Sequence, residues 1–281
     1  MRRASVYTHR RPEDTREALD HLLAAARDVD VELLFDAEET RKHGLQASAG
    51  VVVNVPDTRD VELVFVLGGD GTILTALRRF AGTGVPVFAV NFGQVGFLAT
   101  VEPDGLEEAF LRACRGDFDL LRLPAITLEA PAGIQAAIND VSIHRKVGER
   151  VAMLAYALEG EELGSVRCDG LVVATPAGST GYNLANGGPV LAWGAEGYVI
   201  SFIAPHSLTA RPMVAAPNDA LVISNRSRDE PVDISVDGRP AGQLGPGEAL
   251  TCRFLPEAAL LAQVPGSSFY RRLREKFGRL V

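Results

Sequence analysis

The chain has 281 residues, of which 47% are hydrophobic and 23% charged, as is typical of a globular protein with one large core or two ordinary ones. Its formal net charge of −8 at pH 7 argues against nucleic acid as a main partner. No apolar stretch reaches the length of a membrane span and no signal-peptide pattern is present, so we expect a cytoplasmic protein with no membrane partner. The three cysteines have no paired spacing, which favours buried thiols in a reducing compartment.

Strand and helix patterns alternate along the first part of the chain. Apolar runs predict strands at 4–8, 31–35, 61–67 and 85–90, and helical spacing of apolar residues predicts helices at 12–26, 72–80 and 106–114. Strands separated by helices predict a parallel sheet with right-handed crossovers. We therefore expect an α/β domain over residues 1–118.

Shorter strand-like runs with frequent turns dominate from about residue 119 onward. They favour a mostly antiparallel β domain over residues 119–255. A helical pattern returns at 269–277, in a C-terminal segment, residues 256–281, that we expect to dock back on the body. The predicted fold class is thus α/β, with a parallel-sheet domain followed by a mostly antiparallel β domain.

Five residues, Gly68-Gly69-Asp70-Gly71-Thr72, stand where a buried strand ends and a helix begins. Glycine lets a ligand approach the backbone closely, and the helix N-terminus offers unpaired N–H groups to phosphate. A carboxylate there would repel an anionic substrate unless it takes a proton from a hydroxyl, so Asp70 is a candidate base. The simpler alternative is a tight turn in which Asp70 caps the helix.

The common phosphate loop that ends in Gly-Lys-Ser/Thr is excluded, because none of the three lysines, Lys42, Lys146 and Lys276, follows a glycine. Phosphate chemistry would therefore rely on glycine-rich backbone, arginine and metal. The histidine spacing matches no metal-ligand pattern, so no metal site made of protein ligands is predicted. His43, like His9 and His21, is expected at the surface.

A second dense passage is the segment 175–183, Thr-Pro-Ala-Gly-Ser-Thr-Gly-Tyr-Asn, which follows a predicted strand. It offers hydroxyls, exposable N–H groups and, at Tyr182, a flat face on which a base could stack. The alternative is a strand-to-helix turn with a Ser/Thr cap.

Asn139-Asp140 interrupts an otherwise apolar run at 136–143. Neighbours on a strand point to opposite faces, so at least one of the two is expected to face a core or a cleft. The pair could bind sugar hydroxyls, or form only a bulge or turn. The glycine-containing segment 91–98 follows the strand at 85–90, at the strand end where open α/β sheets bind ligands.

In this order the motifs resemble those of the NAD kinases, which phosphorylate NAD to NADP. The matching segments are 68–72, 91–98, 139–140, 169–170, 175–182, 188–189 and 235–238, and they cover nearly the whole chain. The resemblance implies phosphoryl transfer from ATP or polyphosphate, with Mg²⁺ or another divalent metal, to the 2′-hydroxyl of the adenosine ribose. It implies Asp70 as the base, and a homodimer or homotetramer.

The resemblance also implies which residues bind NAD. Gly71 would lie beside its phosphates, Asp140 would bind ribose hydroxyls and Tyr182 would stack. The full set implied is Gly71, Phe97, Asn139, Asp140, Arg150, Arg167, Asp169, Thr180, Gly181, Tyr182, Asn183, Leu184, Ala185 and Ala204. Asp140 stands where many members carry glutamate, and Gly181 where many carry alanine, differences that bear on affinity and not on the chemistry.

Two other functions stay open at this point. A lipid kinase of the diacylglycerol or sphingosine type shares the Gly-Gly-Asp-Gly sequence, although most of the chain lacks a basic amphipathic membrane face. A non-catalytic NADP-binding sensor would keep the pocket, although the intact Asp70 argues against it.

Overall fold

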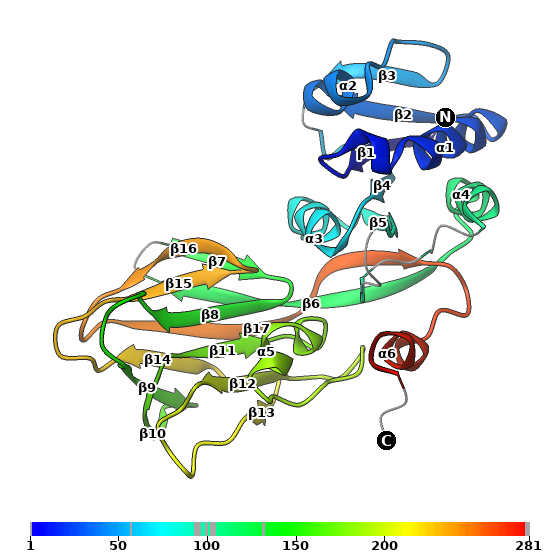
Figure 1. The fold of residues 1–281 in the computed structure, drawn as a ribbon. Helices are drawn as coiled ribbons and strands as arrows, with labels where there is room; N and C mark the ends of the chain where they lie inside the picture. The colour runs from blue at the N-terminus through cyan, green and yellow to red at the C-terminus, as the bar shows by residue number, and fades with distance from the viewer. Residues whose placement is uncertain are drawn as a thin grey trace. The chain divides into compact units, whose positions relative to one another are not determined.

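The computed structural model describes residues 2–56, 58–92, 97–98, 101, 105–130 and 133–278. The chain divides into two compact units, the first made of Met1–Arg122 and Ala259–Val281, the second of Leu123–Ala258. Each unit has a hydrophobic core of its own. Figure 1 labels the helices and strands.

The first unit alternates strands and helices. Its elements are β1 (Arg2–Thr8), η1 (Pro12–Asp14), α1 (Arg16–Asp28), β2 (Val31–Asp36), α2 (Ala37–His43), β3 (Val51–Val55), β4 (Leu63–Leu67), α3 (Asp70–Arg79), β5 (Pro86–Val90), α4 (Leu106–Arg115), the start of β6 (Asp119–Ala130), the end of β17 (Ala249–Gln263) and α6 (Phe269–Phe277).

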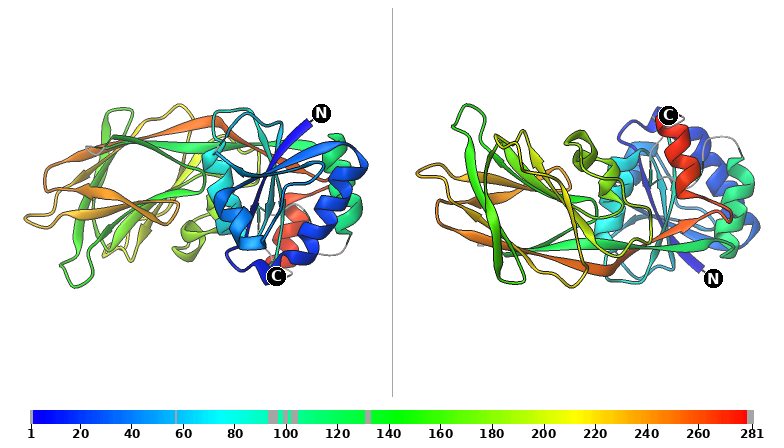
Figure 2. Two further views of the ribbon diagram at one scale, coloured as in Figure 1. Left: turned by 90° about the horizontal axis from the view of Figure 1, so that it is seen from above. Right: turned by 90° about the horizontal axis from the view of Figure 1, so that it is seen from below.

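The sheet of the first unit is parallel, in the order β17–β5–β4–β1–β2–β3. Helices α1 and α4 lie side by side on one face, and α3 lies on the opposite face (Figure 2). With both faces covered, β4 is buried at every residue, which is why it is a continuous apolar run.

The carboxyl ends of three strands meet at one edge of this sheet. Leu67, the last residue of β4, is in register with Thr8 of β1 and with Val90 of β5. Ligands of open α/β sheets bind at this edge, so the fold brings the segment after β4 and the segment after β5 to the place where a ligand is expected. Of the second segment, residues 93–96 lie outside the described part.

His43 is buried, and its expected surface position was wrong. Its Nε2 is 2.7 Å from the Thr8 hydroxyl oxygen, and the Thr8 hydroxyl donates its proton to Glu39 Oε2 at 2.7 Å. These contacts belong to α2, a helix that the sequence analysis missed. The buried residues of α2 are Glu39, Thr40 and His43, and a helix whose inner face is polar has no apolar periodicity.

The second unit is built from strands with short helical turns between them. Its further elements are β7 (Gly133–Ala137), β8 (Asp140–Arg145), β9 (Ala152–Leu158), β10 (Glu161–Cys168), β11 (Gly170–Ala174), η2 (Gly178–Thr180), α5 (Tyr182–Ala185), β12 (Tyr198–Ile203), β13 (Met213–Ala215), β14 (Leu221–Asn225), β15 (Val232–Val236) and β16 (Arg239–Leu244).

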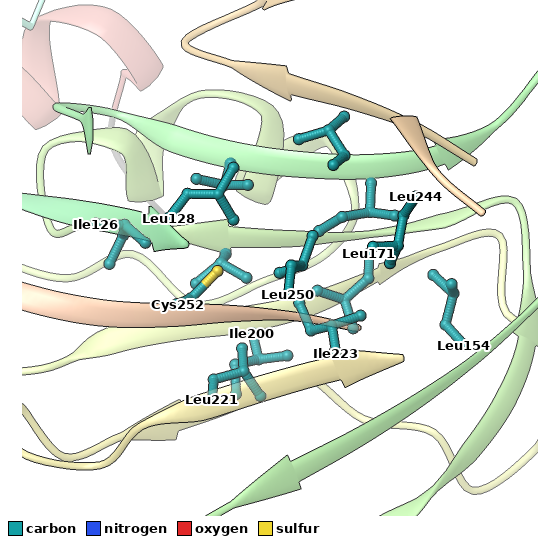
Figure 3. Packing of buried hydrophobic residues seen from close by; sticks show 14 of the residues in the cluster. Ile126, Leu128, Leu154, Leu171, Ile200, Leu221, Ile223, Leu244, Leu250 and Cys252 are labelled. Atoms are coloured by element: carbon teal, nitrogen blue, oxygen red, sulfur yellow. The ribbon is translucent and has the colours of Figure 1, made fainter. Parts of the chain in front are cut away.

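Two antiparallel layers form this unit. One contains β10–β9–β14–β17, with β6 paired to β17 and β7; the other has the order β13–β12–β11–β8–β15–β16. Alternate residues of both layers meet in one apolar cluster that includes Ile126, Leu171 and Leu250 (Figure 3). Burying each such side chain contributes about 1.5–3 kcal/mol.

The parallel sheet followed by antiparallel strands confirms the fold class expected from the sequence. One local difference concerns the run 136–143, which forms two strands instead of one: β7 ends at Ala137, and β8 begins at Asp140 in the other layer. Among the described residues, none of the helices has the length and apolar character that a membrane crossing requires.

Candidate functional site

In the first unit, the candidate base lies at the start of α3. Gly69 is extended and its carbonyl accepts the N–H groups of Thr72 and Ile73 at 2.9 and 3.1 Å, so Asp70 is the first residue of the helix. A carboxylate in the first turn is favoured by the helix dipole by about 0.3–1 kcal/mol. A larger residue would not fit at Gly68, because its Cβ would lie only 2.8 Å from the hydroxyl oxygen of Thr72.

The Asp70 carboxylate is bound by the backbone of the segment that follows β5. Phe97 donates its N–H to Oδ2 at 3.2 Å, and Leu98 donates to Oδ1 at 3.4 Å. Both donors belong to buried residues, whereas Asp70 is half-buried and Gly71 is exposed. The structure thus brings Asp70, Gly71 and Phe97 together and leaves the Asp70 side chain, the candidate base, partly exposed to solvent.

In the second unit, the predicted pair Asn139-Asp140 is held by a residue that the sequence analysis did not select. The Asp237 carboxylate accepts the N–H groups of Ile138, Asn139 and Asp140 at 3.1, 2.7 and 3.2 Å. Asp237 in turn donates its own N–H to the Asp140 carbonyl at 2.9 Å. These bonds fix the bend between β7 and β8.

Asp237 lies in the hairpin turn between β15 and β16. It and Gly238 have φ values of 48° and 70°, as a two-residue Asp-Gly hairpin turn requires. The Asp-Gly pair was a visible turn signal, but nothing local in the sequence indicates that its carboxylate would bind a bend 97 residues earlier.

Asp140 is a buried carboxyl with a high pKa. Burial, and secondly the charge of Asp237, raise the pKa of Asp140 to about 7, because both disfavour the ionised form. The side chain is 8% exposed. At neutral pH this carboxyl therefore changes between a neutral hydrogen-bond donor and an anionic acceptor.

The segment after β11 packs directly on this bend. The Thr175 hydroxyl donates to the Ile138 carbonyl at 2.6 Å, and the Thr175 N–H donates to the Asn139 carbonyl at 2.9 Å. Gly178 lies so close that a Cβ there would overlap the Asn139 carbonyl oxygen. Asn139 Oδ1 is buried and has no hydrogen-bond partner in the described part of the chain.

The predicted residues Thr180 to Ala185 lie in the short elements η2 and α5, with Gly181 between them. Tyr182 is 42% exposed. Burial raises its pKa, and the nearby carboxylates of Asp140 and Asp169 raise it further, so Tyr182 lies within electrostatic reach of both. Asn183 is fully buried and donates to the Ser179 and Pro189 carbonyls at 2.8 and 3.0 Å, which holds the segment 179–189 in shape.

Asp169 is bound by an arginine that the sequence analysis also passed over. Arg145 Nε donates to Asp169 Oδ1 at 2.6 Å, and this hydrogen bond, with the charge of Asp169, raises the pKa of Arg145. The other predicted residues, Arg150, Arg167 and Ala204, make contacts that do not involve this ion pair.

Arg167 is exposed on β10, and its carbonyl accepts the N–H of His206 at 2.7 Å, which places the turn containing Ala204 beside β10. Ala204 has a φ of 44°, in the left-handed region that non-glycine residues seldom occupy. Arg150 is exposed, with its Nε 4.0 Å from Glu230 Oε1, an ion pair that does not involve the Asp140–Tyr182–Asp169 group.

Two family models match the chain. The ATP-NAD kinase N-terminal domain matches residues 37–118, and the ATP-NAD kinase C-terminal domain matches residues 138–263. Curated relatives include an NAD kinase of Gemmatimonas aurantiaca, 32% identical over 98% of this chain and 96% of its own, and one of Oleidesulfovibrio alaskensis, 36% identical over 91% and 89%.

Two solved structures share the fold. Yeast NADH kinase complexed with NADH has a TM-score of 0.88 at 22% identity, and the superposition covers all of this chain and 88% of the yeast chain. An NAD kinase from Archaeoglobus fulgidus in complex with ATP has a TM-score of 0.75 at 24% identity, with 98% of each chain covered.

Proposed function

This chain belongs to the NAD kinase family, and from that premise we propose how its residues carry out the reaction. The reaction is transfer of a phosphoryl group from ATP or polyphosphate to the 2′-hydroxyl of the adenosine ribose of NAD, which gives NADP. We propose Asp70 as the general base that accepts the proton of this hydroxyl. The observation that carries the proposal is the position of Asp70, half-buried at a helix N-terminus and bound by two backbone N–H groups.

Phosphoryl transfer needs positioning and charge neutralisation more than covalent help from the protein. The exposed Gly71, at the start of α3, offers its backbone N–H to phosphate. The N–H groups of Phe97 and Leu98 fix the carboxylate of Asp70 from one side. This preorganisation supports a base whose position must match one hydroxyl of the sugar.

We propose that the second unit supplies the dinucleotide contacts. The Asp140 carboxyl is suited to ribose hydroxyls, since it can both accept and donate a hydrogen bond at neutral pH. The buried acceptor of Asn139 is suited to an N–H donor of the ligand, and the exposed ring of Tyr182 to a stacked base. Arg167, Asp169 and Ala204 complete this proposed surface.

We propose that a divalent metal enters with the phosphoryl donor. Mg²⁺ is usually held by one or two carboxylates together with substrate phosphates. In the described part of the chain, no group of three or more acidic, histidine or cysteine side chains is placed to hold a metal ion. EDTA should stop the reaction and excess Mg²⁺ should restore it.

A coupled assay tests the activity. The purified chain is incubated with NAD, Mg²⁺ and either ATP or polyphosphate, and the product is read with an NADP-specific dehydrogenase. NADP formation with at least one donor is the expected result. Absence of NADP with both donors, while the chain still binds NADP, would indicate the non-catalytic sensor.

We further propose a homodimer or homotetramer in a reducing compartment. Val214 on the edge strand β13 is 51% exposed and Leu163 on the edge strand β10 is 45% exposed, as suits strands covered by another copy. The three cysteines are free and buried, as suits a cytoplasmic protein. Light scattering should give two or four times the chain mass of 30.0 kDa, and a monomer would contradict the assembly.

A further inference from the structure

The C-terminal helix α6 contacts the segment that binds Asp70. Arg272 of α6 donates from Nη1 to the Phe97 carbonyl at 2.9 Å, in buried surroundings. Arg272 is only 9% exposed. Phe97 and Leu98 are the residues whose N–H groups bind the Asp70 carboxylate. The guanidinium and the carboxylate therefore bind the same short stretch of backbone from different sides.

One peptide group connects the two charges. The Phe97 carbonyl and the Leu98 N–H belong to the same planar peptide unit, in which oxygen and hydrogen point in opposite directions. Arg272 binds the oxygen of this unit, and Asp70 binds its hydrogen. Because the unit is planar, fixing its oxygen also fixes the direction of its N–H. A cation at the oxygen also polarises the peptide group, which strengthens donation from the N–H.

The rest of the inner face of α6 packs on the ring of Phe97. The ring centroids of Phe269 and Phe277 are 6.3 and 5.7 Å from that of Phe97, and Lys276 Nζ lies 4.6 Å from its centroid. Together with Arg272 these residues have the spacing i, i+3, i+7 and i+8, which is one face of a helix. Helices α3 and α6 belong to the same compact unit.

We propose that Arg272 is a positioning residue for Asp70. Its guanidinium orients the peptide between Phe97 and Leu98, and this peptide orients the carboxylate toward the sugar hydroxyl. The inference rests on the proposed role of Asp70 as general base. It assigns to the C-terminal helix a part in the reaction, although the helix does not itself supply a reacting group.

The test compares Arg272→Met with Arg274→Met in the full chain. Both substitutions remove the guanidinium group and its positive charge from α6 and keep an unbranched side chain of about the length of the arginine stem, but Arg274 is exposed. We expect Arg272→Met to lower kcat by about 10- to 100-fold, as for a displaced catalytic group, with KM for NAD and ATP changed by less than about 2-fold. Arg274→Met should leave kcat unchanged. Arg272→Lys, which keeps a positively charged donor group but loses the planar fork, should fall between the two.

A double-mutant cycle separates positioning from general stability. In an Asp70→Asn background, Arg272→Met should reduce the residual activity by less than about 2-fold, because residues that act through one group are not additive. The inference would be overturned if Arg272→Met lowered kcat by the same factor in the Asp70→Asn background as in the parent chain. It would also be overturned if the kcat of Arg272→Met equalled that of Arg274→Met. If Arg272→Met does not fold, Arg272→Lys is tested in the same cycle by the same criteria. Full activity of Asp70→Asn alone would instead overturn the role of Asp70.

Discussion

The carboxylate of Asp237 accepts the backbone N–H of Asn139 at 2.7 Å, the shortest of three such bonds to the bend that bears Asn139 and Asp140. A hairpin turn of the second layer therefore holds the backbone from which two proposed NAD contacts project. The opposite side of the bend is held by Thr175, through bonds to the carbonyls of Ile138 and Asn139.

Asp237→Asn is expected to raise KM for NAD and to lower stability. An asparagine amide offers a single acceptor oxygen, so part of the bend loses its partner, and each unsatisfied buried donor costs about 1–3 kcal/mol. Urea unfolding and steady-state kinetics measure the two effects. Asp233→Asn is the matched control, because the Asp233 carboxylate binds Gln243 at an exposed position of the same hairpin. Equal behaviour of the two variants would contradict the role of Asp237.

Asp140 is expected to make stability depend on pH. Its pKa is raised from 3.8 to about 7 by burial and by the charge of Asp237. Between these values the folded chain keeps a proton that the unfolded chain has lost, so the free energy of unfolding falls as the pH rises from about 4 to about 7. The contribution of this proton is complete below the unfolded pKa and is lost above about pH 7.

Asp140→Asn should remove this part of the pH dependence, since an amide does not titrate in this range. The variant should be more stable than the parent chain at pH 8, and the difference should shrink toward pH 4. Urea unfolding at several pH values gives the comparison, with Asp233→Asn again as control. Parallel pH profiles for the parent chain and Asp140→Asn would show that Asp140 is ionised in the folded chain across this range.

Tyr182 should act through its ring. Burial and the carboxylates of Asp140 and Asp169 raise the pKa of its hydroxyl, so the side chain stays neutral at physiological pH. We expect Tyr182→Leu to raise KM for NAD by about 5- to 150-fold, since stacking of a base on an aromatic ring contributes about 1–3 kcal/mol. Tyr182→Phe should stay close to the parent value. A large loss with Tyr182→Phe would indicate that the hydroxyl, and not the ring, binds the ligand.

Local signals were sufficient for the element that carries Asp70. The buried run of β4, the three glycines and the apolar spacing of α3 are contiguous, so strand, turn and helix could be predicted together. The helix starts at Asp70, two residues before its predicted start, because capping by an extended glycine carbonyl leaves no signal in side-chain periodicity.

The supporting residues could not be found in the same way. Arg272 binds Phe97 across 175 residues, and Asp237 binds Asp140 across 97. Contacts between residues so far apart in the sequence depend on which strands pair and on which helix face is buried. A local sequence pattern predicts neither. Arg272 also lies on a helix whose exposed side is strongly basic, which hides one buried guanidinium among several exposed ones.

The most direct test of the central proposal is the turnover of Asp70→Asn. With NAD binding measured by calorimetry and folding by thermal denaturation, Asp70→Asn should bind NAD like the parent chain and stay folded, with a somewhat lower Tm, because the amide keeps the size of the carboxylate but only one of the two oxygens that accept the Phe97 and Leu98 N–H groups. We expect kcat to fall by about 10²- to 10⁴-fold, the usual contribution of a general base, while Asp60→Asn, at an exposed carboxylate paired with Arg3, keeps full activity. Near-normal turnover of Asp70→Asn would contradict the account.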